Sequence, residues 1–269
     1  MAGAAVVKHI KYISLGVGVQ SSYLYVGACD GIFPHADVGI FADTGDEPEY
    51  VYRQLDLLRD YGQGRIPIEV VSAGKLSDDM LGQQSKRSAS VPLFTLGSDG
   101  KAAPLRRQCT DEYKILPIQR CVREMLGFKK GDRIPSDSAI CSIGITIDEA
   151  HRMKPSGKKW TVNDWPLIDA RLRRDDCARG LESLGFPKFS RSACVFCPYH
   201  SDQYWRLLRD NYPEEFEKAL DFDARIRHQT KTDSAAFVHR SLKPLGEVKF
   251  RDEDQMDLFG EECAGMCGV

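Results

Sequence analysis

Short apolar runs alternate with segments of helical periodicity in the first part of the chain, and this alternation constrains the fold most. The apolar runs have the length of buried strands and lie at residues 10–15, 38–42 and 66–71. The helical patterns between them cover residues 20–30 and 46–61. Strands that alternate with helices favour an α/β fold with a doubly wound, mostly parallel sheet.

The rest of the chain contains more helical patterns than apolar runs. A fourth strand is expected at residues 139–147, and helices are expected at residues 111–126 and 174–184. Residues 201–227 predict one helix, or two with Pro213 starting the second. Residues 85–103 are rich in Ser, Gly and Lys without a sustained period, which predicts a long loop.

The composition is that of a globular protein. The 269 residues are 42% hydrophobic and 28% charged, and no run approaches the roughly 18 apolar residues that a membrane helix needs. We expect no signal peptide, because the N-terminus lacks a basic segment and a cleavage site. Nine unevenly spaced cysteines then favour metal or redox chemistry in a reducing, cytoplasmic compartment over a disulfide framework.

Charge is distributed unevenly, although the net charge is only -2. Basic residues recur between residues 101 and 174, whereas the last part of the chain is acidic. A basic middle segment suits an anionic substrate, either nucleotide phosphates or a nucleic acid backbone. A solvated surface is the alternative for any single lysine.

A glycine-bearing turn follows the first expected strand and opens the first expected helix. Its candidate phosphate-binding residues are Ser14, Gly16, Gly18, Gln20, Ser21 and Ser22. Glycines allow close backbone approach to a phosphate, and a helix N-terminus offers N–H donors and a positive dipole end. A tight turn is the alternative, because the third glycine of the dinucleotide fingerprint and the Gly-Lys-Ser/Thr of the P-loop are absent.

A second polar turn, Asp43-Thr44-Gly45, follows the second expected strand. Ligands of open α/β sheets bind beyond the carboxyl ends of the strands, near the point where the strand order reverses. We therefore expect Asp43 and Thr44 to lie beside the glycine-bearing turn and to bind ribose, phosphate or Mg²⁺. A turn with helix-capping residues is the alternative.

Cys194 and Cys197 form a C-x-x-C pair, a spacing that lets two thiolates reach one metal ion. Two cysteines provide only half of the ligands of a four-coordinate metal site. Cys109, which lies in a basic segment, is the best third candidate, and Cys263 or Cys267 near the end of the chain could supply the fourth ligand. A redox-active dithiol is the alternative for the C-x-x-C pair. The other four cysteines fall within helix or strand patterns and are expected to be buried, unligated thiols.

The two turns belong to a set of five motifs in a fixed order. The other three are Cys109-Thr-Asp-Glu-Tyr-Lys114, Gly144-Ile-Thr-Ile-Asp-Glu149-Ala-His-Arg152, and Pro166-Leu-Ile followed by Asp175-Asp176. This set, which spans about residues 10–200, resembles the phosphoadenosine-phosphosulfate (PAPS) reductase family of the adenine nucleotide α-hydrolase-like superfamily, whose glycine turn is called the PP-loop. The turn of this chain is more similar to that of the DNA-phosphorothioation-type members, which are regarded as ATP pyrophosphatases.

The resemblance implies three regions. These are a PP-loop nucleotide-binding α/β domain at residues 1–190, a helical C-x-x-C region packed on it at 191–250, and an acidic, cysteine-bearing tail at 251–269. It also implies that ATP and Mg²⁺ bind at the PP-loop, and that Arg107, Lys114 and Arg152 face the anionic substrate. In the iron–sulfur members, paired cysteines at the position of Cys109 join a C-x-x-C to hold a [4Fe–4S] cluster. Gln108 stands beside Cys109 here, so one iron is either open or held by the tail.

The leading hypothesis is an ATP pyrophosphatase that uses the cluster for sulfur transfer. Sulfur from the cluster, or from Cys263 or Cys267, would pass to a nucleic acid (DNA or RNA) or a nucleotide. Such an enzyme could use a sulfur-donor protein such as a cysteine desulfurase. One alternative is thioredoxin-dependent reduction of adenylyl sulfate or PAPS to sulfite. Another is a nonenzymatic nucleotide-binding subunit with structural Zn²⁺ on Cys109, Cys194 and Cys197.

Overall fold

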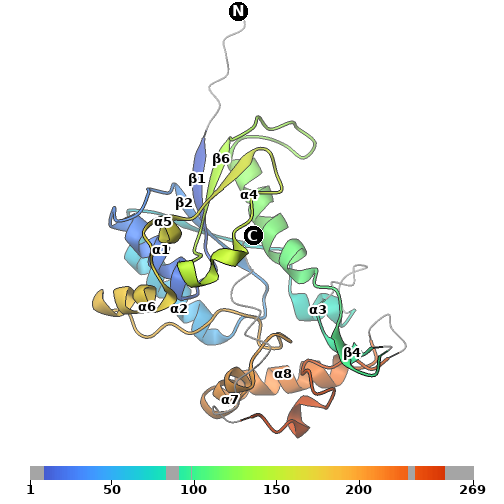
Figure 1. The fold of residues 1–269 in the computed structure, drawn as a ribbon. Helices are drawn as coiled ribbons and strands as arrows, with labels where there is room; N and C mark the ends of the chain where they lie inside the picture. Colours follow the sequence, from blue (N-terminus) through green and yellow to red (C-terminus); the bar gives the residue numbers. More distant parts are fainter. Residues whose placement is uncertain (1–8, 83–90, 98, 230–233, 252–269) are drawn as a thin grey trace, which may run out of the picture.

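The computed structural model describes residues 9–82, 91–97, 99–229 and 234–251 (Figure 1). A five-stranded sheet with the order β3-β2-β1-β6-β7 forms its centre, and each neighbouring pair of strands is parallel. The strands are β1 (Ile10–Ser14), β2 (Val38–Asp43), β3 (Ile68–Ser72), β6 (Ala139–Ile143) and β7 (Thr161–Asp164). Because parallel strands need crossover connections, helices run between them. The predicted α/β fold with a parallel sheet is confirmed.

Helices flank the sheet on both faces. Those of this part of the chain are α1 (Val19–Cys29), α2 (Glu49–Gly62), α3 (Leu76–Met80), α4 (Leu116–Met125), α5 (Pro166–Asp169) and α6 (Arg174–Ser183). Side chains alternate along β1, so that Ile13 packs in the core with α1 and α2, whereas Tyr12 packs with Val122 of α4. Figure 1 shows α1, α2 and α6 on one side of the sheet and α4 on the other.

The strand order reverses at β1. The chain passes from β1 to β2 and β3 on one side, then returns to β6 and β7 on the other. The connections that leave β1 and β6 therefore diverge, and the last residues of these strands, Ser14 and Ile143, are register partners. A Cβ on Gly144 would lie 2.7 Å from the backbone nitrogen of Ser21, so only glycine allows α1 to approach the end of β6 this closely. Such a switch point leaves a crevice for ligands.

The helices α7 (Asp202–Asn211) and α8 (Pro213–Ile226) form the C-terminal part of the described chain, with a short 3₁₀ turn, η3 (Leu245–Glu247). Pro213 begins the second helix, which confirms the two-helix alternative. Phe196 stacks on Phe222 of α8, and the fully buried Trp205 of α7 belongs to the same hydrophobic cluster as α1 and α2. No helix in the described ranges has both the length and the hydropathy to cross a membrane.

Three expectations about the elements were wrong in part. The predicted long loop contains a hairpin, since β4 (Phe94–Leu96) pairs antiparallel with β5 (Ala102–Pro104). Gly97 and Lys101 close the hairpin with a backbone hydrogen bond of 2.7 Å. The sequence also did not predict β7, a four-residue edge strand too short for a periodic signal. β6 ends at Ile143, four residues earlier than expected, because Gly144 turns the chain toward the 3₁₀ helix η2 (Ile147–Arg152).

The helix expected at residues 111–126 is present but begins irregularly. Its first turn, η1 (Asp111–Ile115), is π-helical and continues directly into α4. Pro117 has no N–H, so it cannot donate the α-helical bond to the carbonyl of Tyr113, and a wider turn is tolerated there. This turn carries Lys114 at its inner side, where the residue is buried.

Candidate functional site

The turn between β1 and α1 is held in a strained conformation. Val17 has φ 58°, in the left-handed region that β-branched residues rarely adopt, and its side chain is fully buried. Its carbonyl accepts a hydrogen bond of 2.9 Å from Gln54 Nε2 of α2. Gln54 Oε1 accepts a further bond of 2.7 Å from the backbone N–H of Ser190. One buried amide thus joins the turn to the segment of residues 190–194, which we call the 190–194 strip.

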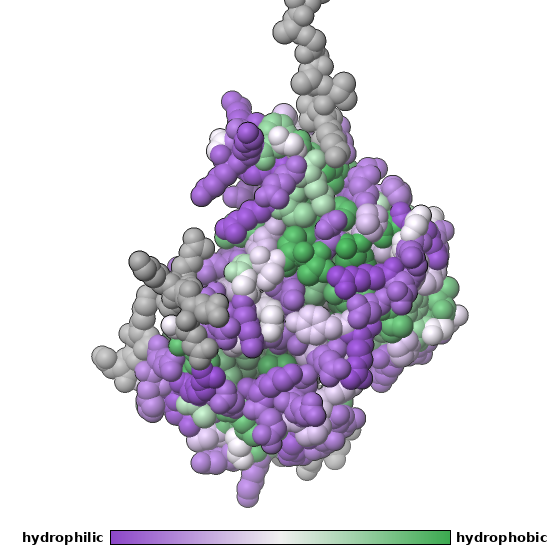
Figure 2. All heavy atoms as spheres, turned by 180° about the vertical axis from the view of Figure 1, so that it is seen from behind, coloured by the Kyte–Doolittle hydropathy of each residue, from purple (hydrophilic) through white to green (hydrophobic). Residues whose placement is uncertain are grey.

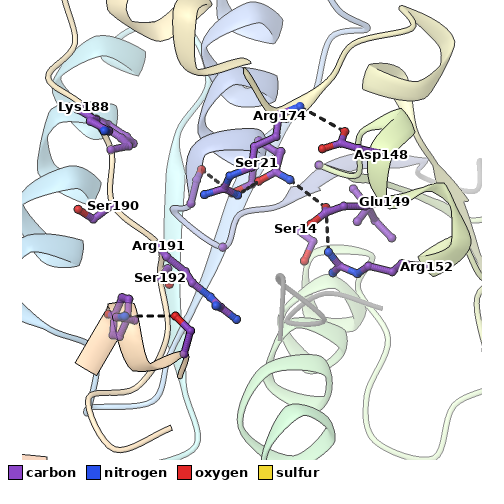
Figure 3. Close-up of a pocket in the computed structure, with 18 of the residues that line it drawn as sticks. Ser14, Ser21, Asp148, Glu149, Arg152, Arg174, Lys188, Ser190, Arg191 and Ser192 are labelled. Atoms are coloured by element: carbon purple, nitrogen blue, oxygen red, sulfur yellow. Dashed lines mark hydrogen bonds and ion pairs between the residues drawn. The ribbon is translucent and has the colours of Figure 1, made fainter. Parts of the chain in front are cut away.

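A cavity of about 670 Å³ lies at the switch point, within the size range of ligand pockets. Backbone and side chains of the β1–α1 turn line one wall, and the residues after β6 line another (Figure 3). The 190–194 strip and α7 complete the lining. The residues of the turn that line this cavity, which we call the switch-point cavity, are Ser14, Gly16, Gly18, Gln20 and Ser21. The strained turn and the N-terminus of α1 therefore face this cavity, as an anion-binding site requires.

Cationic side chains dominate the charge of this cavity. Among its described lining residues, the cations are Arg152, Arg174, Lys188 and Arg191, and the acids are Asp148 and Glu149. Glu149 is already bound, since its Oε2 accepts bonds of 2.9 Å from both Gln20 Nε2 and Arg152 Nη1. Arg174 Nη1 donates to Gln20 Oε1 at 2.8 Å, so Gln20 joins the acid to a second arginine. The cavity is left with an excess of positive charge, which favours an anionic ligand.

Arg152 lines the cavity, and one of its N–H donors is buried without a hydrogen-bond partner among the described residues. The residue is 9% exposed, and its Nε makes no hydrogen bond within the described part of the chain. A buried N–H donor without a partner costs free energy unless a ligand or water completes it. Of the residues expected to face an anionic substrate, Arg152 is the one that lines this cavity.

Three of the expected nucleotide-binding residues do not line the cavity. Ser22 is buried within α1, and its hydroxyl has no partner among the described residues. Asp43 Oδ1 accepts bonds from the Gly45 N–H at 2.8 Å and from the Tyr52 hydroxyl at 2.9 Å, which is the arrangement of a capped turn. Thr44 faces a different pocket, where it contacts Cys194.

The three cysteines singled out as metal ligands line one small pocket, which we call the thiol pocket. Cys109, Cys194 and Cys197 face it from two segments distant in sequence, and its volume is about 40 Å³. Arg107 and Lys114, both expected to face an anionic substrate, lie here and not in the switch-point cavity. The three candidate metal ligands therefore lie together, whereas Arg107 and Lys114 are separated from Arg152, with which they were expected to face one substrate.

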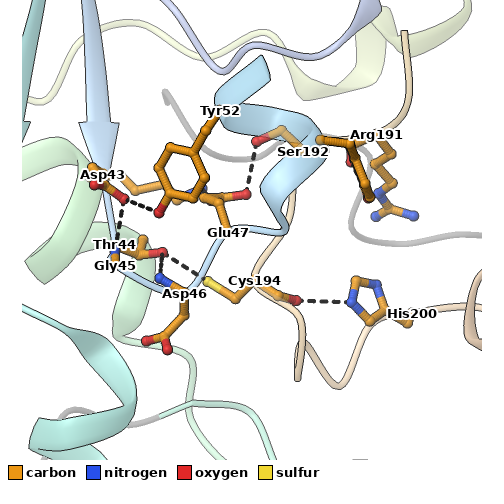
Figure 4. A network of polar contacts seen from close by, with 12 residues as sticks. Asp43, Thr44, Gly45, Asp46, Glu47, Tyr52, Arg191, Ser192, Cys194 and His200 are labelled. Carbon is orange, nitrogen blue, oxygen red and sulfur yellow. Dashed lines mark hydrogen bonds and ion pairs between the residues drawn. The ribbon is translucent and has the colours of Figure 1, made fainter. Parts of the chain in front are cut away.

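Hydrogen bonds of the segment after Cys194 fix the C-x-x-C turn (Figure 4). The Cys197 N–H donates to the Cys194 carbonyl at 2.9 Å, and His200 Nε2 lies 2.9 Å from the same oxygen. Burial lowers the pKa of His200 well below its usual value, so this ring is neutral at pH 7. His200 has a structural role here, in positioning the turn.

The thiol of Cys194 lies in a desolvated place beside charges of both signs. Burial is the main cause that raises its pKa well above the usual value, and the Glu47 carboxylate raises it further. Lys114 opposes this effect, and so does Thr44 Oγ1, which lies 3.2 Å from Cys194 Sγ. Because these effects leave its pKa raised, Cys194 is a protonated thiol and a poor nucleophile at neutral pH.

A buried ion pair connects the two cavities. Lys114 Nζ lies 3.0 Å from Glu47 Oε1, and the Glu47 side chain is completely buried. Glu47 Oε2 accepts a bond of 3.1 Å from the Ser192 hydroxyl of the 190–194 strip. Ser192 lines the switch-point cavity, whereas Cys194, two residues further, lines the thiol pocket. The strip is thus a wall shared by the two cavities.

The donor chemistry of the thiol pocket suits zinc or an iron–sulfur cluster, but its present geometry does not. Within the described ranges, no three His, Cys, Asp or Glu side chains are grouped closely enough to hold a metal ion. A volume of about 40 Å³ is far below the roughly 300–1,000 Å³ of pockets that hold ligands. Cys263 and Cys267, the candidate fourth ligands and sulfur carriers, lie outside the described residues.

Several residues of the site had no signal in the sequence. Gln54 lies in an ordinary amphipathic helix, and its role comes from its contact with Ser190, more than 130 positions away. Lys188 lies in a segment without a periodic pattern. Only knowledge of which segments meet at the switch point could have identified them.

The chain was also compared with known proteins. No protein-family model matches it, and no curated protein matches it either. The resemblance to PAPS reductases therefore depends on the ordered motifs alone, and it is used below only as part of a proposal.

Proposed function

We propose that the protein is a PP-loop enzyme of the adenine nucleotide α-hydrolase-like type that binds ATP in the switch-point cavity and cleaves it between the α- and β-phosphates. The observation that carries the proposal is the cavity itself. A strained turn and a helix N-terminus face it, and arginines from two other segments supply positive charge opposite them.

The proposed reaction is a nucleotidyl transfer to an acceptor oxygen. That oxygen attacks the α-phosphorus, the bond to the bridging oxygen of the β-phosphate breaks, and pyrophosphate leaves with the electron pair. Arg152 and Arg174 would neutralise the charge that develops on the phosphate oxygens, while the N–H groups of the turn position them.

Mg²⁺ would enter with ATP, and Asp148 is the carboxylate that fits it. Asp148 is exposed in the cavity, whereas Glu149 is already bound by Gln20 and Arg152. The ion would supply further neutralisation of the leaving pyrophosphate. The pair Asp43 and Thr44, expected to contribute here, is better explained as support for the turn after β2.

The proposed role of the thiol pocket is sulfur chemistry on the AMP-activated acceptor. Its support is the wall shared with the switch-point cavity and the pair of cations beside the cysteines. Cys109, Cys194 and Cys197 are the proposed ligands of a [4Fe–4S] cluster, with Zn²⁺ as the alternative. Because the three thiols do not converge as they stand, we assign the cluster no step in the reaction.

Two measurements test these proposals separately. Incubation with α-labelled ATP and Mg²⁺, with and without single-stranded nucleic acid, should give AMP or an adenylylated acceptor together with pyrophosphate. Release of inorganic phosphate and ADP instead would contradict cleavage between the α- and β-phosphates.

Anaerobic purification with iron, sulfide and zinc analysis tests the cofactor. The metal found should be lost in Cys194→Ala. It should be kept in Cys177→Ala, a variant of a buried cysteine outside the thiol pocket.

A further inference from the structure

We infer that a second cavity, on the α4 face of the sheet, receives one base of a polynucleotide acceptor whose phosphates lie on two basic loops beside it. The inference rests on the proposed function, because it assigns the acceptor of that reaction. It concerns a part of the molecule that the ATP site does not use.

The second cavity has a volume of about 410 Å³. Tyr12, Cys141 and Asn163 form its floor, and these residues are register partners on neighbouring strands of the sheet. Leu116 and Ile118 of α4 supply an apolar wall. A pocket that combines apolar contact surface with hydroxyl and amide groups has the chemistry that enzymes use to hold a base removed from its stack.

Ser14 lines both this cavity and the switch-point cavity. It is the last residue of β1, so the two cavities meet where the carboxyl end of the strand reaches the turn. A base in the second cavity would therefore lie next to the switch-point cavity. Both cavities lie within the size range of ligand pockets, so ATP in the larger one leaves the second cavity for another molecule.

Two loops rich in lysine lie beside each other, and the second of them lines the second cavity with residues 155–158. The loop before β6 carries the exposed residues Lys129, Lys130 and Arg133, and the loop before β7 carries the exposed residues Lys154, Lys158 and Lys159. Lys158 itself lines the cavity. The acids on these loops are Asp132 and Asp137. In Figure 2, hydrophilic side chains project from the upper part of this face, beside a band of hydrophobic residues.

The two loops are tied to each other and to the sheet. The Asp137 N–H donates to the Lys159 carbonyl at 3.1 Å. Asn163 Nδ2 donates to the Lys154 carbonyl at 2.9 Å, so a residue of the cavity floor also holds the second loop. Arg123 of α4 donates to the carbonyl of Lys129 at 2.9 Å. A fixed group of exposed cations next to a base-sized cavity fits a nucleic acid backbone better than a free nucleoside.

The first test measures binding of dye-labelled single-stranded DNA and RNA by fluorescence anisotropy at several salt concentrations, without ATP. The variant Lys158→Glu/Lys159→Glu should bind about tenfold more weakly or worse, with a salt slope lower by about two. The control Lys243→Glu/Lys249→Glu makes the same change of net charge at exposed residues of the C-terminal part and should bind as the wild type does. Equal binding by both variants would overturn the inference.

The second test uses an oligonucleotide with one 2-aminopurine, whose fluorescence rises when the base leaves its stack. The wild type should raise this fluorescence, and Leu116→Trp, which fills the cavity from a partly exposed position, should abolish the rise while binding stays within about threefold. If Leu116→Trp instead weakens ATP binding, the second cavity holds the adenine of ATP and the inference is wrong. An absence of any rise in the wild type would also overturn it.

These outcomes separate the inference from the proposed function. Oligonucleotide binding and base insertion are measured without ATP, so they can succeed even if no pyrophosphate is ever released. Conversely, ATP titration of Lys158→Glu/Lys159→Glu should give wild-type affinity, because neither lysine lines the switch-point cavity. If the wild type releases pyrophosphate but fails both oligonucleotide tests, the proposed ATP cleavage stands. The polynucleotide is then excluded as its acceptor.

Discussion

Val17 holds a backbone conformation that favours glycine, although its side chain is fully buried. Ala removes the two buried γ-methyl groups and Gly removes the Cβ as well, but Ala keeps a Cβ in the left-handed region, whereas Gly does not. We therefore expect Val17→Gly to be more stable than Val17→Ala by about 1 kcal/mol, the reverse of the usual order. Thermal unfolding should show a difference of about 2–4 °C in Tm. Equal or higher stability of the Ala variant would mean that the turn carries no strain.

Arg152 is the second residue for which the structure makes a sharp prediction. Loss of its donors should weaken binding of a nonhydrolysable ATP analogue by about tenfold to hundredfold, because hydrogen bonds to charged groups contribute about 1.5–3 kcal/mol. Arg152→Gln alone leaves the buried Glu149 without its ion-pair partner, so the informative variant is Glu149→Gln/Arg152→Gln. Isothermal titration calorimetry measures the affinity of this double variant for the ATP analogue. Arg59→Gln, which changes an exposed arginine of α2, is the control. Wild-type affinity in the double variant would exclude a phosphate contact by Arg152.

The residues of the glycine-bearing turn could be predicted because local chemistry determines them. Ser14, Gly16 and Gly18 follow a strand and precede a helix, and they line the cavity as expected. Asp43 and Thr44 also follow a strand, but their polar atoms are used by Gly45, Tyr52 and Cys194. A sequence shows that a polar side chain is at the correct edge of the sheet, but it does not show which neighbour the side chain binds.

At the scale of elements, α2 supports the site chiefly through Gln54, while its Tyr50 hydroxyl donates to the Arg191 carbonyl. Gln54 binds the Val17 carbonyl and the Ser190 backbone, so it connects the β1–α1 turn with the 190–194 strip. Gln54→Met keeps the size of the side chain but removes these bonds, and it should cost about 2–3 kcal/mol because buried backbone groups lose their partners. Hydrogen exchange of the Ser190 amide should accelerate in this variant. The same substitution at the exposed Gln229 should change neither quantity.

The accuracy of the predicted elements followed the strength of their periodic signals. α6 and α8 carry clear caps or an N-terminal proline, and they begin where expected. β4, β5 and β7 have three or four residues each, and such strands exist because of their partners and not because of a local pattern. The π-helical turn η1 could not be predicted either, although Pro117 is its local cause. Its consequence, the inward position of Lys114, depends on Glu47 across the core.

At the scale of the whole molecule, Glu47 joins three parts of the chain that the sequence keeps far apart. It lies in the loop after β2, pairs with Lys114 of η1, and accepts a bond from Ser192 of the 190–194 strip. One buried carboxylate therefore connects the wall of the switch-point cavity with the thiol pocket. A substitution of Glu47 should therefore disturb both cavities together. A substitution of Gln54, which contacts the wall of one cavity, should disturb only that one.

A double-mutant cycle on this pair measures how strongly the two cavities are joined. Glu47→Gln keeps an acceptor for Ser192 but removes the carboxylate that pairs with the buried Lys114 ammonium, so it should cost about 3–5 kcal/mol of the free energy of unfolding. Lys114→Met should cost a similar amount, because it leaves the buried Glu47 carboxylate without its ion-pair partner. The double variant leaves no buried charge and should recover most of the loss, because apolar or neutral groups can replace a buried ion pair at little cost. Urea unfolding of the four proteins gives the coupling energy. Additive losses would show that Glu47 and Lys114 act independently and that the two cavities are held together by other contacts.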